Sequence, residues 1–107
     1  MIAVLFEADA VPEKQDRYLQ LAADLKPLLT QAPGFISLER FQSLATPGKI
    51  LSLSWWEDEE AVLNWKRDPQ HQAAQAEGKY SLFSRYRIRI AHVVREYAVE
   101  AGEAHHG

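Results

Sequence analysis

Residues 54–75 read SWWEDEEAVLNWKRDPQHQAAQ, and the rest of the chain can be placed around this stretch. Its first residues continue a strand that ends in two tryptophans, and the apolar spacing changes to a helical period at Glu57-Asp58. Two carboxylates are favoured at the positive end of a helix, so a helix is expected to begin there. Asp68-Pro69 interrupts that helix, and the alanines and glutamines that follow predict a further helical piece.

Composition limits the classes of protein to which the chain can belong. Its 107 residues suit one domain, for which we expect residues 1–99, followed by a mobile tail over 100–107. No apolar run approaches the roughly 20 residues that cross a bilayer, and the net charge of −3 argues against a nucleic-acid surface. The absence of cysteine excludes disulfides and thiol catalysis and fits a cytoplasmic location. We therefore expect neither a membrane nor a nucleic acid as partner.

The N-terminal third predicts a strand followed by a helix. Residues 2–8 are rich in strand-forming side chains, and Pro12 limits the strand. From Glu13 an apolar stripe recurs at helical spacing, formed by Tyr18, Leu21, Ala22, Leu25, Leu28 and Leu29. Pro27 falls inside this stripe and is expected to kink the helix or to end its regular part near Lys26.

A hairpin and one long strand complete the sheet. Residues 34–43 alternate as a strand does, and the Pro47-Gly48 turn joins them to residues 49–56, which place Leu51, Leu53 and Trp55 on one face. Gly78 is expected to stop the last helical piece. Residues 81–99 alternate isoleucines with arginines and predict a final strand, with a bulge near Ala91-His92 where the alternation slips.

The order strand, helix, strand, strand, helix, strand predicts a ferredoxin-like βαββαβ sandwich of the α+β class, with an antiparallel sheet. Two helices can cover only one face of such a sheet. The uncovered face predicts a homodimer through that open face, and the final strand is long enough to reach the second subunit.

In several segments the chain resembles the antibiotic biosynthesis monooxygenase family of dimeric α+β barrels. The resemblance spans roughly residues 2–97 and rests on the element order, the helix with Trp65, the long final strand and three short segments: Pro33-Gly34-Phe35, residues 51–57 and Asp68-Pro69-Gln70-His71. It implies a dimeric barrel. For activity it implies a cofactor-independent monooxygenase acting on phenols or quinol-like compounds, or a haem-degrading monooxygenase, within a family that also holds members of unknown activity.

The haem-degrading branch can be tested against the residues that the resemblance implies. That branch has a tryptophan on the second helix, a haem-ligating histidine ten residues later and an asparagine near the end of the first strand. Trp65 matches the tryptophan, but Gln75 stands at the histidine position and Glu7 at the asparagine position. An amide is a poor iron ligand, and His71, six residues after Trp65, would point to another side of a regular helix. We therefore expect no haem and no other cofactor.

A cofactor-independent oxygenase needs an apolar pocket, a base that titrates near neutral pH and a donor for the substrate oxyanion. The candidates are His71 as base and, for substrate binding, Trp65, Gln75, Phe83, Arg85 and Tyr86. Three of them have a structural alternative: Trp65 as core, His71 as a solvated side chain, and Arg85 as part of a polar strand face or a dimer salt bridge. The alternative function is a non-catalytic dimeric module that binds a small hydrophobic or aromatic ligand, and a haem-degrading monooxygenase is a less favoured second alternative.

Overall fold

The computed structural model describes residues 1–77 and 82–101 and shows one antiparallel sheet packed against helices. In chain order the elements are β1 (Ile2–Ala10), η1 (Pro12–Lys14), α1 (Gln15–Thr30), β2 (Phe35–Gln42), β3 (Lys49–Trp56), α2 (Glu59–Lys66), α3 (Pro69–Glu77) and β4 (Phe83–His92). The strand order is β2-β3-β1-β4, with every neighbouring pair antiparallel. This arrangement confirms the ferredoxin-like α+β fold that the element order predicts.

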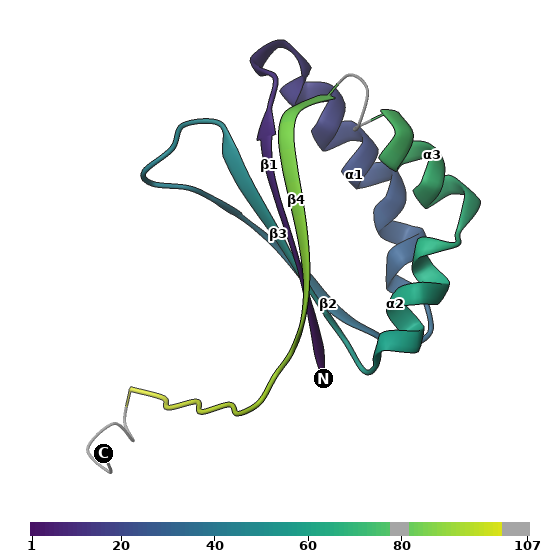
Figure 1. The fold of residues 1–107 in the computed structure, drawn as a ribbon, viewed down its shortest axis with the longest axis vertical. Helices are drawn as coiled ribbons and strands as arrows, with labels where there is room; N and C mark the ends of the chain where they lie inside the picture. Colours follow the sequence, from purple (N-terminus) through teal and green to yellow (C-terminus); the bar gives the residue numbers. More distant parts are fainter. Residues whose placement is uncertain (78–81, 102–107) are drawn as a thin grey trace.

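The helices and the sheet form two layers, with the helices on one side of the strands (Figure 1). Residues paired across neighbouring strands share a face of the sheet. Because Val4 pairs with Ser54 on one side and with Ile90 on the other, even-numbered strand residues face the helices, and register shifts bring Phe35 and Phe83 to the same side. The opposite face, here called the open face, carries the other odd-numbered residues of the strands, including Leu51, Leu53 and Trp55, as predicted. No element of the described chain covers it.

The core lies where α2 meets the sheet and the end of α1. Trp56 and Ile2 are each 1% exposed, and they cluster with Leu29, Ala61 and Val62. The indole N–H of Trp56 donates to Ser54 Oγ at 2.9 Å, so this buried donor is satisfied. Trp56, the second tryptophan of residues 54–75, is therefore buried beneath the helices, while Trp55 lies on the open face.

The Pro33-Gly34 turn packs directly against α2. Gly34 has φ +80°, and a Cβ at this position would lie 2.5 Å from the Cβ of Ala61. The backbone N–H of Glu57 donates to the Gly34 carbonyl at 2.8 Å. Only glycine combines this φ with so close an approach, and the contact fixes where α2 begins relative to β2.

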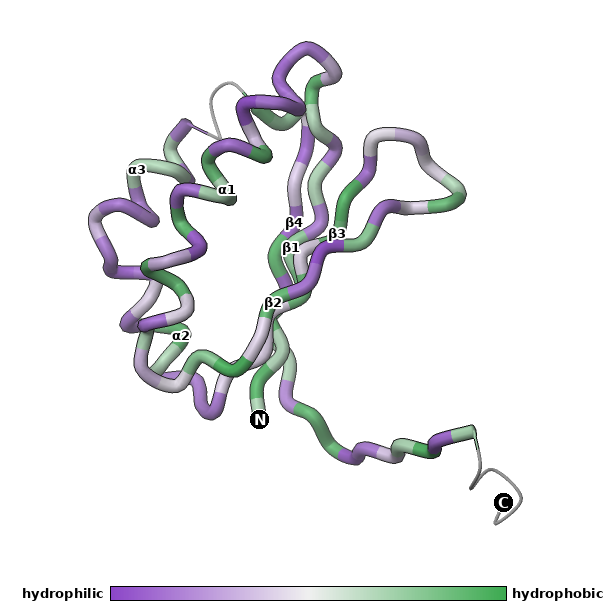
Figure 2. Tube along the Cα trace, turned by 180° about the vertical axis from the view of Figure 1, so that it is seen from behind, coloured by the Kyte–Doolittle hydropathy of each residue, from purple (hydrophilic) through white to green (hydrophobic). Residues whose placement is uncertain are grey.

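Helix α1 continues past its proline. Figure 2 shows hydrophobic residues interspersed with hydrophilic ones along this helix, as expected of an amphipathic helix. Pro27 lies inside α1, which ends at Thr30, so the expectation that the helix ends near Lys26 is wrong. Proline removes one backbone donor, but Leu29 is buried against the core and Thr30 Oγ1 donates to the Pro27 carbonyl at 3.0 Å, which holds the last turn in place.

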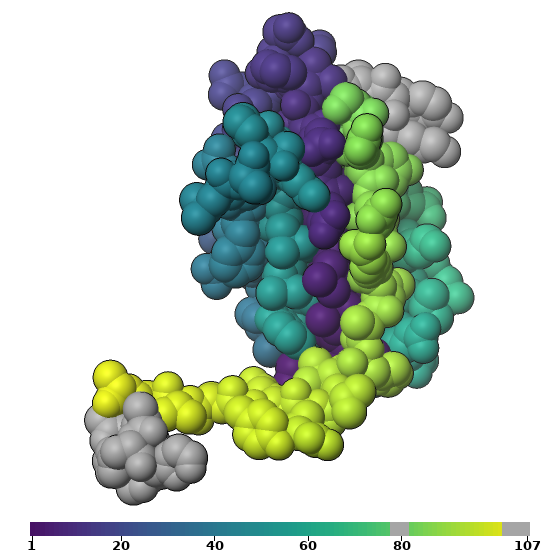
Figure 3. Space-filling model, turned by 60° about the vertical axis from the view of Figure 1, so that its left-hand side comes forward, coloured from purple at the N-terminus to yellow at the C-terminus, as the bar shows by residue number. Residues whose placement is uncertain are grey.

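The final strand is shorter than predicted and has no bulge near Ala91-His92. Its register with β1 is continuous there, pairing His92 with Ile2, and the register shift occurs instead at the other end, between Asp9 and Ala10. The last backbone contact between the two segments lies just beyond β1 and β4, where the Val93 N–H donates to the Met1 carbonyl at 3.1 Å. The following residues run away from the sheet as an arm, residues 93–101 (Figure 3).

Three predictions fall on residues outside the described ranges. They are the helix stop at Gly78, the strand start at Ser81 and the end of the tail beyond residue 101. Among the helices within residues 1–77 and 82–101, none is both long and apolar enough to span a membrane.

Candidate functional site

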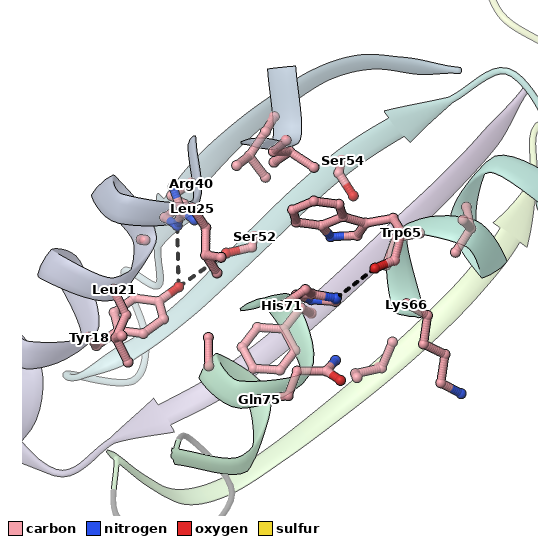
Figure 4. A pocket seen from close by; sticks show the side chains of 18 of the residues that line it. Tyr18, Leu21, Leu25, Arg40, Ser52, Ser54, Trp65, Lys66, His71 and Gln75 are labelled. Atoms are coloured by element: carbon pink, nitrogen blue, oxygen red, sulfur yellow. Dashed lines mark hydrogen bonds between the residues drawn. The ribbon is translucent and has the colours of Figure 1, made fainter. Parts of the chain in front are cut away.

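A cavity of about 270 Å³ lies between the helices and the sheet. Apolar side chains form most of its wall, many of them from α1, β1 and β4, and five aromatic residues line it: Phe6, Tyr18, Trp56, Trp65 and Phe83. The volume is close to the lower end of the range for small-ligand pockets, roughly 300–1,000 Å³. Figure 4 shows the few polar groups that interrupt the apolar wall. Such a cavity suits a small hydrophobic molecule with a limited number of polar atoms.

Two aspartates determine how the helices beside the cavity begin. Asp58 Oδ1 accepts from the Ala61 N–H at 2.8 Å and caps α2. Asp68 Oδ1 accepts from the N–H groups of Gln70 and His71, at 2.9 and 3.0 Å, and caps α3 in the same way. The predicted break at Asp68-Pro69 is confirmed, and it starts a new helix in a new direction.

The break brings His71 onto Trp65. Their rings stack with centroids 4.7 Å apart and planes 22° apart, and both residues line the cavity. The expectation that a spacing of six would turn His71 to another side is therefore wrong. That spacing rule holds for one continuous helix, and the chain leaves the helix between the two residues.

His71 is held as a neutral ring with one defined tautomer. Its Nδ1 lies 3.2 Å from the Trp65 carbonyl oxygen, which can only accept, so the proton of the neutral ring is on Nδ1 and Nε2 carries a lone pair. Burial lowers the pKa of His71, opposed by the hydrogen bond to Trp65 and by the charge of Asp68. At neutral pH the ring is thus a neutral imidazole that can accept a second proton at Nε2.

A second polar group in the cavity was not predicted from the sequence. The Tyr18 hydroxyl, on a residue 8% exposed, lies 3.2 Å from Ser52 Oγ and accepts a hydrogen bond from Arg40 Nε at 3.3 Å. The three residues come from α1, β2 and β3 and are called the polar corner. The sequence held one signal for it, because strand alternation puts Arg40 on the same side as Leu38, a residue that packs against the core.

The other predicted site residues divide between two places. Gln75 and Phe83 line the cavity with His71 and Trp65. Tyr86 is not among the lining residues; it faces the helix side at the edge strand and stacks on Phe6, with ring centroids 5.9 Å apart. Arg85 lies on the open face, where its Nε is 3.8 Å from Asp9 Oδ2. Adjacent strand residues point to opposite faces, so the sheet does not bring Arg85 to the cavity.

The donor set of the cavity can also be compared with what metal and haem sites require. In the described ranges, no three histidine, aspartate or glutamate side chains come together as a metal site would need. Gln75 occupies the cavity wall ten residues after Trp65, and its amide is a weak iron ligand. The lining residues thus supply one imidazole, one amide and several hydroxyl groups.

Comparison with known proteins relates this fold and cavity to one family. A family model described as antibiotic biosynthesis monooxygenase matches residues 1–77. Jasmonate monooxygenase ABM of Pyricularia oryzae is 40% identical over 93 residues, covering 87% of this chain and 43% of that protein. YqjZ of Bacillus subtilis, an uncharacterized protein, is 30% identical over 84 residues, covering 78% of this chain and 66% of that protein.

The solved structures add a likeness of fold. The crystal structure of an antibiotic biosynthesis monooxygenase superposes with a TM-score of 0.76 at 18% identity, covering 89% of this chain and 100% of that chain. In sequence, the matched region spans less than half of the Pyricularia oryzae protein and about two thirds of the Bacillus subtilis protein. The likeness to these relatives is therefore that of one domain.

Proposed function

Since the chain belongs to the antibiotic biosynthesis monooxygenase family, we propose that it is a cofactor-independent monooxygenase for a small aromatic or quinol-like substrate, with His71 as the base. The observation that carries this proposal is the state of His71. A neutral imidazole with its proton on Nδ1 lies on the wall of an apolar, aromatic-lined cavity. A base in such a place can deprotonate a phenol or an enolisable ketone.

The reaction can be written for an anthrone-type substrate, in which a methylene group becomes a carbonyl. His71 Nε2 takes a proton, and the resulting carbanion transfers one electron to dioxygen. Recombination forms a carbon–oxygen bond, and the peroxide anion regains the proton from the imidazolium. Loss of water, with the second methylene proton, leaves the carbonyl. One substrate and one dioxygen thus give one ketone and one water, and the substrate supplies all the electrons.

The other lining residues have defined tasks in this scheme. The rings of Trp65 and Phe83 provide flat walls for an aromatic substrate and exclude water from the anion. The Gln75 side chain offers two N–H donors on the same wall, which can hold the oxyanion that forms on deprotonation. Arg85 and Tyr86 have no task here, because neither lines the cavity.

Oxygen uptake by the purified protein tests the proposal. The panel contains hydroquinones, anthrone and jasmonate, the last because the relative that is 40% identical is named for it. We expect uptake above the uncatalysed rate with at least one of these compounds, and a loss of about a hundredfold or more in His71→Ala. His92→Ala is the matched control, since His92 lies outside the cavity lining and should retain full activity.

Three outcomes of the oxygen-uptake assay would contradict the proposal. Uptake that survives in His71→Ala would remove His71 from the role of base. Absence of uptake with every compound, combined with saturable binding of one of them, would replace the oxygenase by the non-catalytic ligand-binding module. Turnover that appears only after haem is added would show that the haem-dependent alternative is correct.

We further propose that the active form is a homodimer in which a second copy covers the open face. Charged residues at one end of this face pair within the chain, with Glu7 Oε1 3.5 Å from Arg89 Nη1 and Glu7 Oε2 3.7 Å from Lys49 Nζ. The apolar part of the face centres on Leu5, Leu51, Leu53 and Trp55, and Glu39 and Arg87 also lie on this face. The arm beyond His92 carries Val94, Tyr97 and Val99, which are 90%, 81% and 67% exposed. An uncovered apolar cluster on the sheet, beside an arm that exposes three large apolar side chains, supports a dimer interface here.

The cytoplasm is the compartment that we propose for this enzyme. A chain without cysteine needs no oxidising environment, and its surface is acidic overall, with a net charge of −3. Fractionation of cells that express the protein checks this, and recovery in a secreted or membrane fraction would contradict it.

A further inference from the structure

The charges that line the cavity are all of one sign. Among the lining residues, all of which lie in the described ranges, there is no aspartate or glutamate, while Arg40 and Lys66 are both present. This contrasts with the whole chain, in which acidic residues outnumber basic ones by 15 to 12. A cation at the wall of an apolar cleft that holds no carboxylate favours an anionic ligand over a neutral one of the same shape.

The polar corner shows where such an anion would bind. Arg40 pairs with Ser52 across β2 and β3, and its guanidinium carbon lies 5.9 Å from the centre of the Tyr18 ring. Its Nε donates to the Tyr18 hydroxyl, so the N–H groups of both terminal nitrogens remain as donors for a ligand. Within residues 1–77 and 82–101, Arg40 forms no ion pair with a carboxylate. The guanidinium thus retains a bidentate edge without an acidic partner.

Tyr18 and Ser52 extend this donor set. Because the Tyr18 hydroxyl accepts from Arg40, its own hydrogen is directed to another acceptor, either Ser52 Oγ or an atom of a ligand. Figure 4 places the polar corner on one side of the cavity and the stacked Trp65 and His71 on the other, with the Lys66 ammonium turned away from both. Arg40 itself is exposed, so the polar corner lies at the rim of the cavity.

We infer that the cavity selects small organic acids, with the ligand carboxylate on Arg40 and Tyr18 and the apolar body lying within the cavity toward His71. This inference rests on the proposed function, because it names the substrate class of the same site. A carboxylate takes two parallel hydrogen bonds from a guanidinium edge, and Arg is the side chain best suited to that geometry. The apolar wall, including Leu25 and Leu38, then receives the hydrocarbon part of the acid.

Calorimetric titration with a matched pair of ligands tests the inference. Cyclohexylacetate and cyclohexylacetamide have nearly the same shape and differ in charge. We expect the wild-type protein at low ionic strength to bind the acid about tenfold more tightly than the amide, and added salt to reduce the difference. Equal affinities, or no measurable binding of the acid, would overturn the inference.

Three arginine variants assign the effect to the polar corner. Arg40→Gln should remove the preference for the acid, and Arg40→Lys should keep part of it because the charge stays while the bidentate edge is lost. Arg85→Gln removes the same charge from the open face and should leave the preference unchanged. A preference that persists in Arg40→Gln, or that vanishes equally in Arg85→Gln, would overturn the assignment.

The binding measurement needs no turnover, so its result is separate from that of the oxygenase assay. A preference for the acid can hold in His71→Ala, whose polar corner is intact. Failure of oxygen uptake alone would leave the acid site in place, and failure of the acid preference alone would leave the oxygenase in place.

Discussion

The imidazole of His71 lies flat against the indole of Trp65, with ring centroids 4.7 Å apart and planes 22° apart. The backbone carbonyl of the same tryptophan also accepts the hydrogen bond from His71 Nδ1. One residue therefore fixes both the ring plane and the tautomer of the histidine. These two constraints leave Nε2 as the proton acceptor, which is why the geometry of this pair decides what the cavity can do.

Acidification should destabilise the protein in part through His71. Burial lowers the pKa of His71 below its ordinary value of 6.5, so the unfolded chain binds this proton at a higher pH than the folded one. The corresponding stability is fully present above the unfolded pKa and is lost as pH falls through the folded pKa. Urea unfolding at a series of pH values should show a weaker dependence on pH below 6.5 in His71→Asn. His92→Asn is the control, and equal slopes for His71→Asn and wild type would contradict the expectation.

Gly34 should be the less replaceable of the two glycines with positive φ. In Gly34→Ala the added Cβ would lie 2.5 Å from the Ala61 Cβ, whereas at Gly48, which has φ +83°, the nearest atom is the Ala10 carbonyl oxygen at 4.0 Å. Backbone strain alone should cost about 1 kcal/mol in Gly48→Ala. Gly34→Ala adds a steric clash in the core, and we expect a loss of about 2–4 kcal/mol in the free energy of unfolding.

A second variant separates the clash from the strain at Gly34. Ala61→Gly removes the atom that a new Cβ would meet. The double variant Gly34→Ala, Ala61→Gly should therefore be more stable than the sum of the two single losses predicts, by a coupling measured in denaturant unfolding. Strict additivity would show that the turn moves away from α2 instead of clashing with it.

The sheet could be predicted closely because its signals are local. The alternation of residues along β3 predicts which side chains share a face of the sheet. The turn at Gly48 and the break at Pro69 are marked by glycine and proline, whose backbone preferences favour a turn and a helix interruption. Alternation also held the information that Arg85 and Tyr86 cannot share one pocket wall, since neighbours in a strand face opposite ways.

The cavity was less predictable because its parts meet only in three dimensions. The stacking of His71 on Trp65 depends on the direction that α3 takes after the break, and the sequence marks the break without giving that direction. The polar corner joins Tyr18 to Arg40 and Ser52 from three elements, and no spacing along the chain relates them. The end of β4 at His92 was missed because apolar residues continue beyond it in the arm.

Helix α3 should loosen when its tie to α1 is removed. Arg17 donates to both carboxylate oxygens of Glu77, with Nε–Oε2 2.6 Å and Nη2–Oε1 2.9 Å, and this hydrogen bonding lowers the pKa of Glu77. The helix that carries His71 and Gln75 has no fully buried residue of its own, and His71 is only partly buried. Arg17→Gln should speed amide hydrogen exchange in α3, and should raise KM for any substrate of the cavity more than it lowers kcat.

The pair lies at the surface, so its effect should also respond to salt. High ionic strength should speed exchange in α3 of the wild-type protein and leave Arg17→Gln nearly unchanged. Lys26→Gln is the control. It removes a positive charge from α1, the helix that also carries Arg17, and should leave hydrogen exchange in α3 as in the wild-type protein. Unaltered exchange in Arg17→Gln would show that helix packing alone holds α3.

The oligomeric state of the protein should depend on the open face. Leu53 lies at the middle of this face, paired with Leu5 on one side and Glu39 on the other. If a second copy covers the face, Leu53→Glu buries a charge in the interface and should yield a monomer, because an unpaired buried carboxylate costs several kcal/mol. Leu44→Glu introduces the same charge at a fully exposed loop position and should remain dimeric. Light scattering at micromolar concentration measures both. A wild-type monomer, or a dimer that survives Leu53→Glu, would mean that the open face is not an interface between copies of this chain.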